Sequence, residues 1–420
     1  MMRKGVPLLL VLVFLTASCM GASKPVSAAS PNTWTSKTPM QVARAYLGVA
    51  VVDEKIYAIG GDEGSETGNC MTGTSTTYRV VNATEEYNPN LDTWVSKAQM
   101  PTARACFGTA VYHDLIYCIG GYNGATVFYG PESYNWKTEY YDVCVNEVYD
   151  PATNTWHTKT SMPTPRFSAA TNIVNGKIYV IGGHTKTDLW RNFNLNEVYD
   201  PETDSWATKA PAPFNVSSPA SAVVDNKIYV LGEDPNANWK NVILIYDPAN
   251  DNWTIGASAP VSYAATAGAT TGVKAHKRIY FFDENRTDVY DPMSDSWTVG
   301  ATAPTDRLIA KAAVVDDLFY LIGGRTGQWG YMTFMYPSTL NEQYTPIGYG
   351  TPDAPTPSPS PSQTPNPTPT PTESPASSPE ATSPNKEPEL TSVNIVAVAS
   401  GASVAAIGIG LFLYFKKRKH

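Results

Sequence analysis

The stretch Asn146-Glu-Val-Tyr-Asp-Pro-Ala-Thr-Asn-Thr-Trp156 decides the fold, because versions of it return along most of the chain. A Tyr, a Pro two residues later and a Trp five residues after the Pro occur together five times, at Tyr87/Pro89/Trp94, Tyr149/Pro151/Trp156, Tyr199/Pro201/Trp206, Tyr246/Pro248/Trp253 and Tyr290/Pro292/Trp297. Units that recur at a regular spacing indicate a repeat architecture, in which each unit buries its faces against its neighbours.

A second element lies ahead of each of these units. It is an aliphatic strand with a Tyr, which in most copies ends in two glycines, and it spans residues 56–61, 116–121, 178–183, 228–233, 279–284 and 319–324. Before each copy comes a run of small and β-branched residues, joined to it by a turn such as Asn175-Gly176, which is a strong hairpin signal. Each unit therefore predicts four short strands.

These three signals in one order, with successive Trp residues 44 to 62 positions apart, resemble the kelch repeat, a β-propeller unit. The resemblance covers residues 32–349 and implies an all-β ring of six four-stranded blades. The region begins with a lone Trp34 and ends with a unit that lacks its Trp. We therefore predict a six-bladed kelch-type β-propeller over residues 31–350, in which the N-terminal strand completes the last blade.

The first residues have the order of a secretory signal peptide. Arg3 and Lys4 precede an apolar run, and small residues follow up to Ala28, which predicts a signal peptide over residues 1–28. Cys19 leaves a lipoprotein alternative open, because a cleaved Cys can carry lipid.

Three further segments follow the predicted propeller. Residues 351–391 are rich in Pro, Thr and Ser and predict a disordered linker that extends as polyproline II. Residues 393–415 are uncharged and apolar, long enough for a transmembrane helix, and residues 416–420 form a basic tail. We expect a single-pass protein at the cell surface, with the propeller outside and the C-terminus cytoplasmic.

The charge balance argues against nucleic acid as a partner. The formal net charge is −8, and the region between residues 31 and 350 remains acidic once both ends are removed. Binding to a phosphate backbone needs a basic surface, which this composition does not supply.

Long loops are predicted on one rim of the ring. They follow the glycine pairs at residues 62–82, 122–144, 184–195, 233–241 and 325–340, whereas the loop near Asn285 is very short. They carry His184 and an aromatic set that includes Tyr122, Trp136, Trp190, Trp239 and Trp329. These side chains could stack on sugar rings or anchor a protein partner, or they could fill small cores within the loops themselves.

A set of arginines is predicted near the mouth of the central channel. Arg44, Arg104, Arg166 and Arg307 each lie thirteen residues before the Tyr of a glycine-pair strand, with Tyr263 and Val216 in the two remaining places. Four guanidinium groups around a channel would favour a carboxylate or another anion. The alternative is structural: each Arg would satisfy backbone carbonyls of neighbouring blades.

No metal or cofactor site is predicted. The loop rim carries one His, and a Zn or Cu site needs several His or Cys ligands. The paired His and Tyr copper ligands that a galactose-oxidase-like kelch enzyme requires cannot be placed in this sequence.

The cysteines and sequons suit a secreted domain. Cys70 and Cys144 lie in the two longest predicted loops and are predicted to form a disulfide, whereas Cys106 and Cys118 are predicted to be buried thiols. Four Asn-x-Ser/Thr sequons are candidate glycosylation sites, at Asn82, Asn215, Asn252 and Asn285.

We interpret the chain as a non-enzymatic recognition module that binds an extracellular protein or glycan through its long-loop rim. One alternative is a surface carbohydrate-active enzyme, because six-bladed kelch proteins include a sialic-acid mutarotase. Such an enzyme would need an acid or base, such as Asp62 or Glu284, near a ligand held by the arginines. The other alternative is a structural envelope protein.

Overall fold

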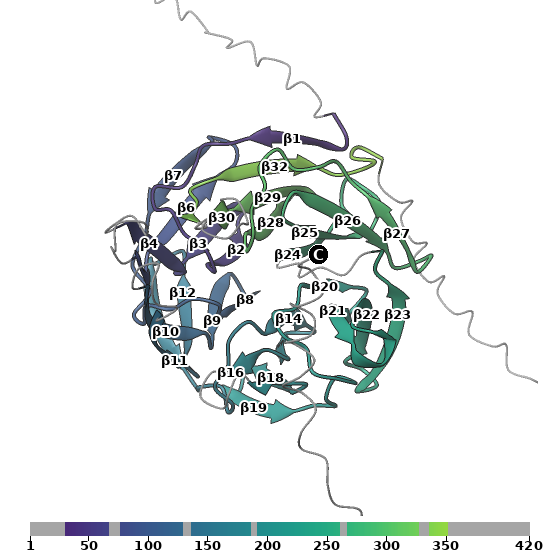
Figure 1. Ribbon diagram of the computed structural model, residues 1–420, viewed down its shortest axis with the longest axis horizontal. Coiled ribbons are helices and arrows are strands. Elements are labelled where there is room, and N and C mark those ends of the chain that lie inside the picture. Colours follow the sequence, from purple (N-terminus) through teal and green to yellow (C-terminus); the bar gives the residue numbers. More distant parts are fainter. Residues whose placement is uncertain are drawn as a thin grey trace, which may run out of the picture. The chain divides into compact units, whose positions relative to one another are not determined.

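The structure is a computed structural model that describes residues 30–66, 76–128, 136–185, 191–260, 267–326 and 336–351. The predicted signal peptide, transmembrane helix and basic tail, and all but the first residue of the predicted linker, lie outside these residues. Within them, no helix has the length and apolar character needed to cross a membrane. The described strands form a ring of six four-stranded sheets around a central channel (Figure 1). The prediction of an all-β, six-bladed propeller is confirmed.

Each blade is an antiparallel sheet whose strands we call a, b, c and d from the channel outward. Blade 1 consists of β2 (Gly48–Val52), β3 (Lys55–Ile59), β6 (Thr84–Asn88) and β7 (Thr93–Ser96). Blade 2 consists of β8 (Gly108–Tyr112), β9 (Leu115–Ile119), β12 (Asn146–Asp150) and β13 (Thr155–Lys159). Blade 3 consists of β14 (Ala170–Val174), β15 (Lys177–Ile181), β18 (Asn196–Asp200) and β19 (Ser205–Thr208). Blade 4 consists of β20 (Ser221–Val224), β21 (Lys227–Asp234), β22 (Lys240–Asp247) and β23 (Asn252–Ser258). Blade 5 consists of β24 (Ala267–Thr270), β25 (Ile279–Asp283), β26 (Arg286–Asp291) and β27 (Ser296–Val299). Blade 6 consists of β28 (Lys311–Val315), β29 (Leu318–Ile322), β32 (Asn341–Thr345) and β1 (Thr33–Ser36).

The ring closes as predicted, because strand β1 from the beginning of the propeller is strand d of blade 6. Trp34 of β1 lies opposite Tyr344 of β32, and the two rings are 5.0 Å apart. The Tyr344 hydroxyl also donates to Oδ1 of Asn32 at 2.7 Å. Residues from the two ends of the propeller therefore share one sheet.

The repeated Tyr and Trp fasten each blade to the one before it. In blade 4 the Tyr246 hydroxyl donates to Oδ1 of Asp251 at 2.6 Å, and the same oxygen accepts the backbone N–H of Ala210, which follows strand d of blade 3. The indole of Trp253 donates to the carbonyl of Ala210 at 2.9 Å. In all six blades an Asp or Asn accepts one hydrogen bond from the Tyr hydroxyl and one from a backbone N–H that follows strand d of the preceding blade. These residues are Asn32, Asp92, Asn154, Asp204, Asp251 and Asp295. We call this arrangement the blade latch.

Small residues let the inner strands approach each other around the channel. A Cβ atom on Gly108 of blade 2 would collide with Thr171 of blade 3. At the end of strand b the requirement is conformational instead: Gly61 has a φ of +99°, a region that residues with a Cβ rarely adopt. Both features explain why the sequence repeats glycine at these places.

The segments predicted as long loops form strands of their own on one rim. Four of these strands make an additional antiparallel sheet in the order β11-β10-β5-β4, which we call the rim sheet. Four further strands make two short hairpins. The rim sheet contains β4 (Asp62–Glu66), β5 (Thr76–Val80), β10 (Tyr122–Phe128) and β11 (Trp136–Asp142), and the hairpins are β16 (His184–Thr185) with β17 (Arg191–Asn192) and β30 (Arg325–Thr326) with β31 (Tyr336–Pro337). Because β10 of blade 2 pairs with β5 of blade 1, the rim sheet joins two blades.

Blades 4 and 5 differ from the others on this rim. In blade 4 the strands β21 and β22 continue past the usual glycine position as far as Asp234 and Lys240, with a single 3₁₀ turn, η2 (Pro235–Ala237), between them. In blade 5 strand b turns directly into strand c at the pair Asp283 and Arg286. The rim is therefore built unequally around the ring.

Candidate functional site at the channel mouth

Backbone pairing brings one polar residue from each of four blades to the same rim. The residue after each glycine pair forms an isolated antiparallel bridge with the segment that leads into strand a of its own blade. These bridges join Ala45 to Asp62, Ala105 to Tyr122, Phe167 to His184 and Leu308 to Arg325. The predicted placement of Tyr122 and His184 on one rim agrees with this geometry.

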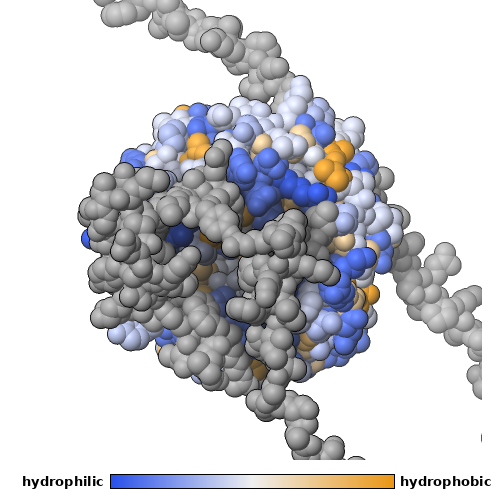
Figure 2. Space-filling model, viewed as in Figure 1, coloured by the Kyte–Doolittle hydropathy of each residue, from blue (hydrophilic) through white to orange (hydrophobic). Residues whose placement is uncertain are grey.

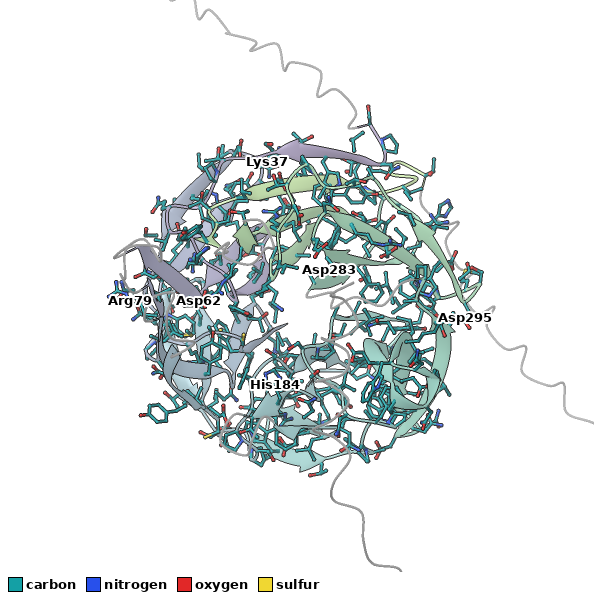
Figure 3. The ribbon with its side chains drawn as sticks, viewed as in Figure 1. Lys37, Asp62, Arg79, His184, Asp283 and Asp295 are labelled. Atoms are coloured by element: carbon teal, nitrogen blue, oxygen red, sulfur yellow. The ribbon has the colours of Figure 1, made fainter. Side chains whose placement is uncertain are left out.

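Asp62 and Arg325 form an ion pair between blade 1 and blade 6. Nη2 of Arg325 lies 2.6 Å from Oδ2 of Asp62, and the guanidinium carbon lies 5.1 Å from the centre of the Tyr46 ring. Burial raises the pKa of Asp62 to about 6, although the charge of Arg325 and hydrogen bonds from Arg325 and Tyr122 oppose the shift. Figure 3 labels Asp62 and His184 among the side chains of the ring.

His184 lies on the same rim in a largely apolar contact. Its ring meets the Phe167 ring edge-on with centroids 4.0 Å apart, and Phe167 in turn meets Tyr122 at 5.3 Å. Burial lowers the pKa of His184, although the charge of Asp142 opposes the shift. The imidazole is therefore favoured in its neutral form.

The four predicted arginines do not face a ligand. Each is buried, with at most 1% of its surface exposed, and each forms an ion pair with a glutamate of strand c in its own blade: Arg44 with Glu85, Arg104 with Glu147, Arg166 with Glu197 and Arg307 with Glu342. The expectation of an anion site made by these guanidinium groups is therefore wrong. The structural alternative is right that the arginines bind backbone carbonyls, but these carbonyls belong to the arginine's own blade and not to a neighbouring one.

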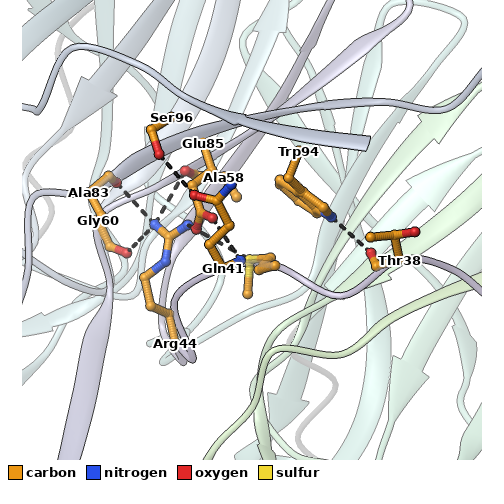
Figure 4. Close-up of polar contacts among 10 residues, drawn as sticks. Thr38, Gln41, Arg44, Ala58, Gly60, Ala83, Glu85, Trp94 and Ser96 are labelled. Carbon is orange, nitrogen blue, oxygen red and sulfur yellow. Dashed lines mark hydrogen bonds and ion pairs between the residues drawn. The ribbon is translucent and has the colours of Figure 1, made fainter. Parts of the chain in front are cut away.

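Arg44 shows how the two terminal nitrogens of such a guanidinium group are used (Figure 4). Its Nη1 donates to the carbonyls of Ala58, Gly60 and Ala83 at 3.0 to 3.2 Å, and its Nη2 lies 2.5 Å from Oε2 of Glu85. The group thus ties strand b to strand c at the point where strand b ends. The outcome removes the anion-binding part of the enzyme alternative.

The glutamate partners were missed in the sequence, although a signal for them exists. Each lies two residues before the Tyr of strand c in the same four blades that carry the Arg. In blade 4 both positions change together, to Val216 and Leu244, and these two residues share one apolar cluster. In blade 5 the buried Asp288 holds the glutamate position and binds Arg286 through two hydrogen bonds, at 2.6 and 2.9 Å.

Two cavities lie along the ring axis. The channel cavity has a volume of about 320 Å³ and is lined by strand a of all six blades. The mouth cavity has a volume of about 210 Å³, and its lining includes Tyr46, Cys106, Ser168, Ser218 and Ile309. These five residues all have positive φ and each lies two positions after an Arg or after Val216, so they are equivalent members of one ring.

Comparison with known proteins agrees with this architecture. The kelch motif matches residues 43–101, 103–163 and 165–213, which are the first three blades with their lead-in segments. Residues 43–213 carry kelch repeats. Beta-scruin of Limulus polyphemus is 31% identical over 154 residues, which make up 36% of this chain and 14% of beta-scruin. Kelch-like protein terF of Aspergillus terreus is 30% identical over 154 residues, which make up 36% of this chain and 30% of terF.

The fold is also found in a solved structure. The structure of YjhT matches with a TM-score of 0.53 and 14% identity, and the match covers 72% of this chain and 95% of YjhT. At this identity the likeness shows the fold alone. The aligned part spans less than a third of beta-scruin and of terF, so what those proteins do as a whole does not transfer to this chain.

The structure describes some of the aromatic side chains predicted on the rim of the kelch propeller and not others. Trp239 is 62% exposed in the blade 4 turn, which leaves it available to a partner. The side chain of Trp136 in β11, and the whole of Trp190, Trp329 and Tyr263, lie outside the part of the chain that the structure describes. Their binding roles stay predictions.

The cysteines and sequons of the kelch propeller were placed as follows. Cys106 and Cys118 are free and buried, as predicted, and Cys118 lies opposite Thr109. Cys144 is a free thiol in this structure and its predicted partner Cys70 lies outside the described residues, so the disulfide stays a prediction. Among the sequon residues, Asn215, Asn252 and Asn285 are exposed and Asn82 is half-buried.

Burial also decides what the cysteine at the mouth can do. It raises the pKa of the Cys106 thiol to about 12, so this group stays protonated at neutral pH and is a poor nucleophile. Within the described residues no three His, Cys, Asp or Glu side chains gather in a way that would hold a metal ion.

Proposed function

We propose that this kelch propeller is a cell-surface recognition module that binds a protein partner through its rim sheet. The apolar segment 393–415, followed by the basic residues 416–420, supports membrane attachment, and the segment that resembles a signal peptide supports secretion. Kelch propellers generally bind proteins, which favours a protein partner. The finer question is which surface of this one carries the interaction.

The observation that carries the proposal is the rim sheet itself. Four strands from blades 1 and 2 form a sheet that belongs to none of the six blades, with Ala125 of β10 opposite Arg79 of β5. Insertions that fold into ordered structure on one rim of a rigid scaffold are typical of binding surfaces. The propeller does not need this sheet to close, because all six blades have their four strands without it.

The exposed edge of the rim sheet favours a polypeptide as the partner. Among the described residues, β11 pairs with β10 and with no other strand, so its outer side presents backbone N–H and C=O groups. An extended peptide can satisfy these groups by adding a strand, which a glycan cannot do. Tyr141 on β11 is 68% exposed and offers an aromatic contact beside that edge.

The surrounding surface suits recognition by polar and backbone contacts. On the face drawn in Figure 2 the described surface is mainly hydrophilic, with small, separate apolar patches. At the inner end of β11 the Asp142 carboxylate accepts a hydrogen bond from Thr185 of β16, which fixes the rim sheet to blade 3. This contact orders one end of the edge, and ordering before binding lowers the entropy that is lost when a partner binds.

Site-specific photo-crosslinking in the full-length protein on cells tests the proposal. A photoreactive residue replaces Tyr141 in one variant and Leu91 in the control, because Leu91 is similarly exposed, at 70%, in the turn between strands c and d of blade 1. We expect one discrete protein adduct from position 141 and none from position 91. The adduct should be competed away by an excess of the unaltered protein, and not by a variant in which the short turn of blade 5 replaces the β10–β11 hairpin.

Two results would contradict the proposal. One is an equal adduct from position 91, which would show that crosslinking does not depend on the rim sheet. The other is glycan-array binding by the full-length protein that survives removal of the β10–β11 hairpin, which would place recognition elsewhere and favour a glycan.

A further inference from the structure

A cavity that is separate from the channel lies between blades 3 and 4. This side cavity has a volume of about 400 Å³, and strands b, c and d of blade 3 line it together with Pro248 of blade 4. Asn175 of the a–b turn also lines it, and both this turn and the c–d turn that carries Pro248 lie at the end of the blades away from the glycine pairs. The side cavity therefore lies toward the face opposite the rim sheet.

Small residues explain why the cavity occurs at this interface. Blade 3 has Ala207 on strand d, opposite the residue that precedes the Tyr of strand c. At this place the other blades have the larger residues Thr35, Val95, His157, Thr254 and Thr298. Between blades 2 and 3 the Tyr112 hydroxyl donates to Glu202 at 2.8 Å. Val174 and Ala249 stand at these two places between blades 3 and 4, so that contact cannot form there.

The Tyr179 hydroxyl is an unpartnered polar group in this cavity. Tyr179 is only 4% exposed and lines the side cavity, and its hydroxyl makes no hydrogen bond with the described residues. In blade 1 the equivalent Tyr57 hydroxyl donates to Glu86 at 2.9 Å, whereas blade 3 has Val198 in place of Glu86. Burial raises the pKa of Tyr179, although the charge of Lys177 opposes the shift, so the group is a donor at neutral pH. A ligand that accepts a hydrogen bond would satisfy it.

The charged groups that line the side cavity leave one positive charge. Nζ of Lys177 lies 2.5 Å from Oδ2 of Asp200, so these two charges offset each other. The third charged group is Lys209, which makes no ion pair among the described residues. Its charge acts on Asp251 without pairing with it, because Oδ1 of Asp251 accepts the Tyr246 hydroxyl in the blade latch. The lining is therefore complementary to an anion.

We propose that the side cavity is a binding site for a small organic carboxylate. The Tyr179 hydroxyl donates a hydrogen bond to the carboxylate and the Lys209 ammonium pairs with it, while Val198, Ala207 and Pro248 contact the apolar body of the ligand. Apolar walls with a few polar groups, in a cavity of this size, are typical of small-molecule sites. An inorganic anion has no apolar body for these walls. The site is separate from the rim sheet and does not depend on the proposed protein partner.

The test is a titration of the full-length protein with sodium 4-fluorobenzoate, followed by ¹⁹F NMR of the ligand. Tyr179→Phe removes only the hydroxyl and should weaken binding about tenfold, as expected for a hydrogen bond to a charged group. Lys209→Gln should weaken binding about two- to fivefold, because this lysine is partly exposed and its ion pair is screened by water. Ala207→His places the residue of blade 2 in the cavity and should abolish binding.

Tyr57→Phe is the matched control, because it removes the equivalent hydroxyl in blade 1 and should leave binding unchanged. Without ligand, Tyr179→Phe should unfold in urea at the same concentration as the parent, since its hydroxyl has no partner to lose. The proposal is overturned if the unaltered protein does not bind 4-fluorobenzoate, if Tyr179→Phe binds it as tightly, or if folded Ala207→His still binds it. It is also overturned if sodium phosphate displaces the ligand as effectively as sodium benzoate, because the apolar walls would then have no role.

Discussion

Removing one partner of the buried pair between Arg166 and Glu197 should destabilise the propeller more than removing both. The Arg166 guanidinium is fully buried, and only 6% of the Glu197 side chain is exposed. In Arg166→Val the carboxylate keeps the Thr164 hydroxyl, at 2.7 Å, as a hydrogen-bond partner and loses its counter-charge. Breaking a buried ion pair in this way typically costs about 3–5 kcal/mol of unfolding free energy. The same range applies to Glu197→Leu, which leaves the guanidinium unpaired.

Blade 4 shows that the fold accepts an apolar pair at these positions. Val216 and Leu244 replace the ion pair there and pack in one cluster with Val242. The double variant Arg166→Val with Glu197→Leu copies this arrangement into blade 3. Besides the ion pair it removes three hydrogen bonds, because Arg166 donates to the carbonyls of Val180 and Thr164 and the Thr164 hydroxyl donates to Glu197. We therefore expect a cost of about 1–3 kcal/mol, smaller than that of either single variant.

The assay is urea unfolding of the full-length protein at pH 7, followed by tryptophan fluorescence, with all three variants measured together. Leu244→Glu is the matched control, because it buries a carboxylate in blade 4 without an Arg, and it should cost as much as the single variants. The reasoning is refuted if the double variant loses the sum of the two single losses, since additive costs would mean that the two charges do not stabilise each other.

Three further predictions concern the latch, the ring closure and the rim. Asp251→Ala should cost about 1–3 kcal/mol, because it leaves the buried Tyr246 hydroxyl without its acceptor, and urea unfolding against the exposed Asp306→Ala measures this. Asn32→Ala should weaken the pairing of β1 with β32, seen as faster amide hydrogen exchange in β1 with exchange in blade 3 unchanged. Because the pKa of Asp62 is raised to about 6, folding favours its protonated form and its contribution to stability falls as pH rises from about 4 to about 6. Asp62→Asn should remove this part of the pH dependence, so a difference in unfolding free energy between variant and parent that stays constant over that range contradicts the assignment.

The architecture was readable in the sequence because the same local interactions recur in every blade. The Tyr and Trp of the repeated motif both take part in the blade latch, and any residue that packs between blades must recur as often as the blades do. The Asp or Asn of the latch, such as Asp251, was also readable, since in blades 1 to 5 it lies five residues after the Tyr. It escaped notice because its role depends on a backbone N–H of the preceding blade, about forty residues away in the chain.

The candidate site was less readable, because its chemistry depends on burial and on contacts between blades. The spacing of Arg44 and its equivalents placed them correctly at the start of each blade. It did not show that each side chain turns inward to a Glu on strand c. The rim sheet was missed because it pairs strands from two different blades.

The glycine pair connects the scaffold to the candidate site. In blades 1, 2, 3 and 6 the second glycine has a φ between +85° and +100°, and its N–H donates to a carbonyl in the lead-in segment of the next blade. Strand b therefore ends there, and the following residue is delivered to the rim as Asp62, Tyr122, His184 or Arg325. Blade 4 has Glu233 in place of the second glycine and blade 5 has Glu284, and in both blades strand b runs on into strand c without a separate rim strand. The glycines are thus a structural requirement of the repeat, and at the same time they determine which blades can contribute a side chain to the mouth of the channel.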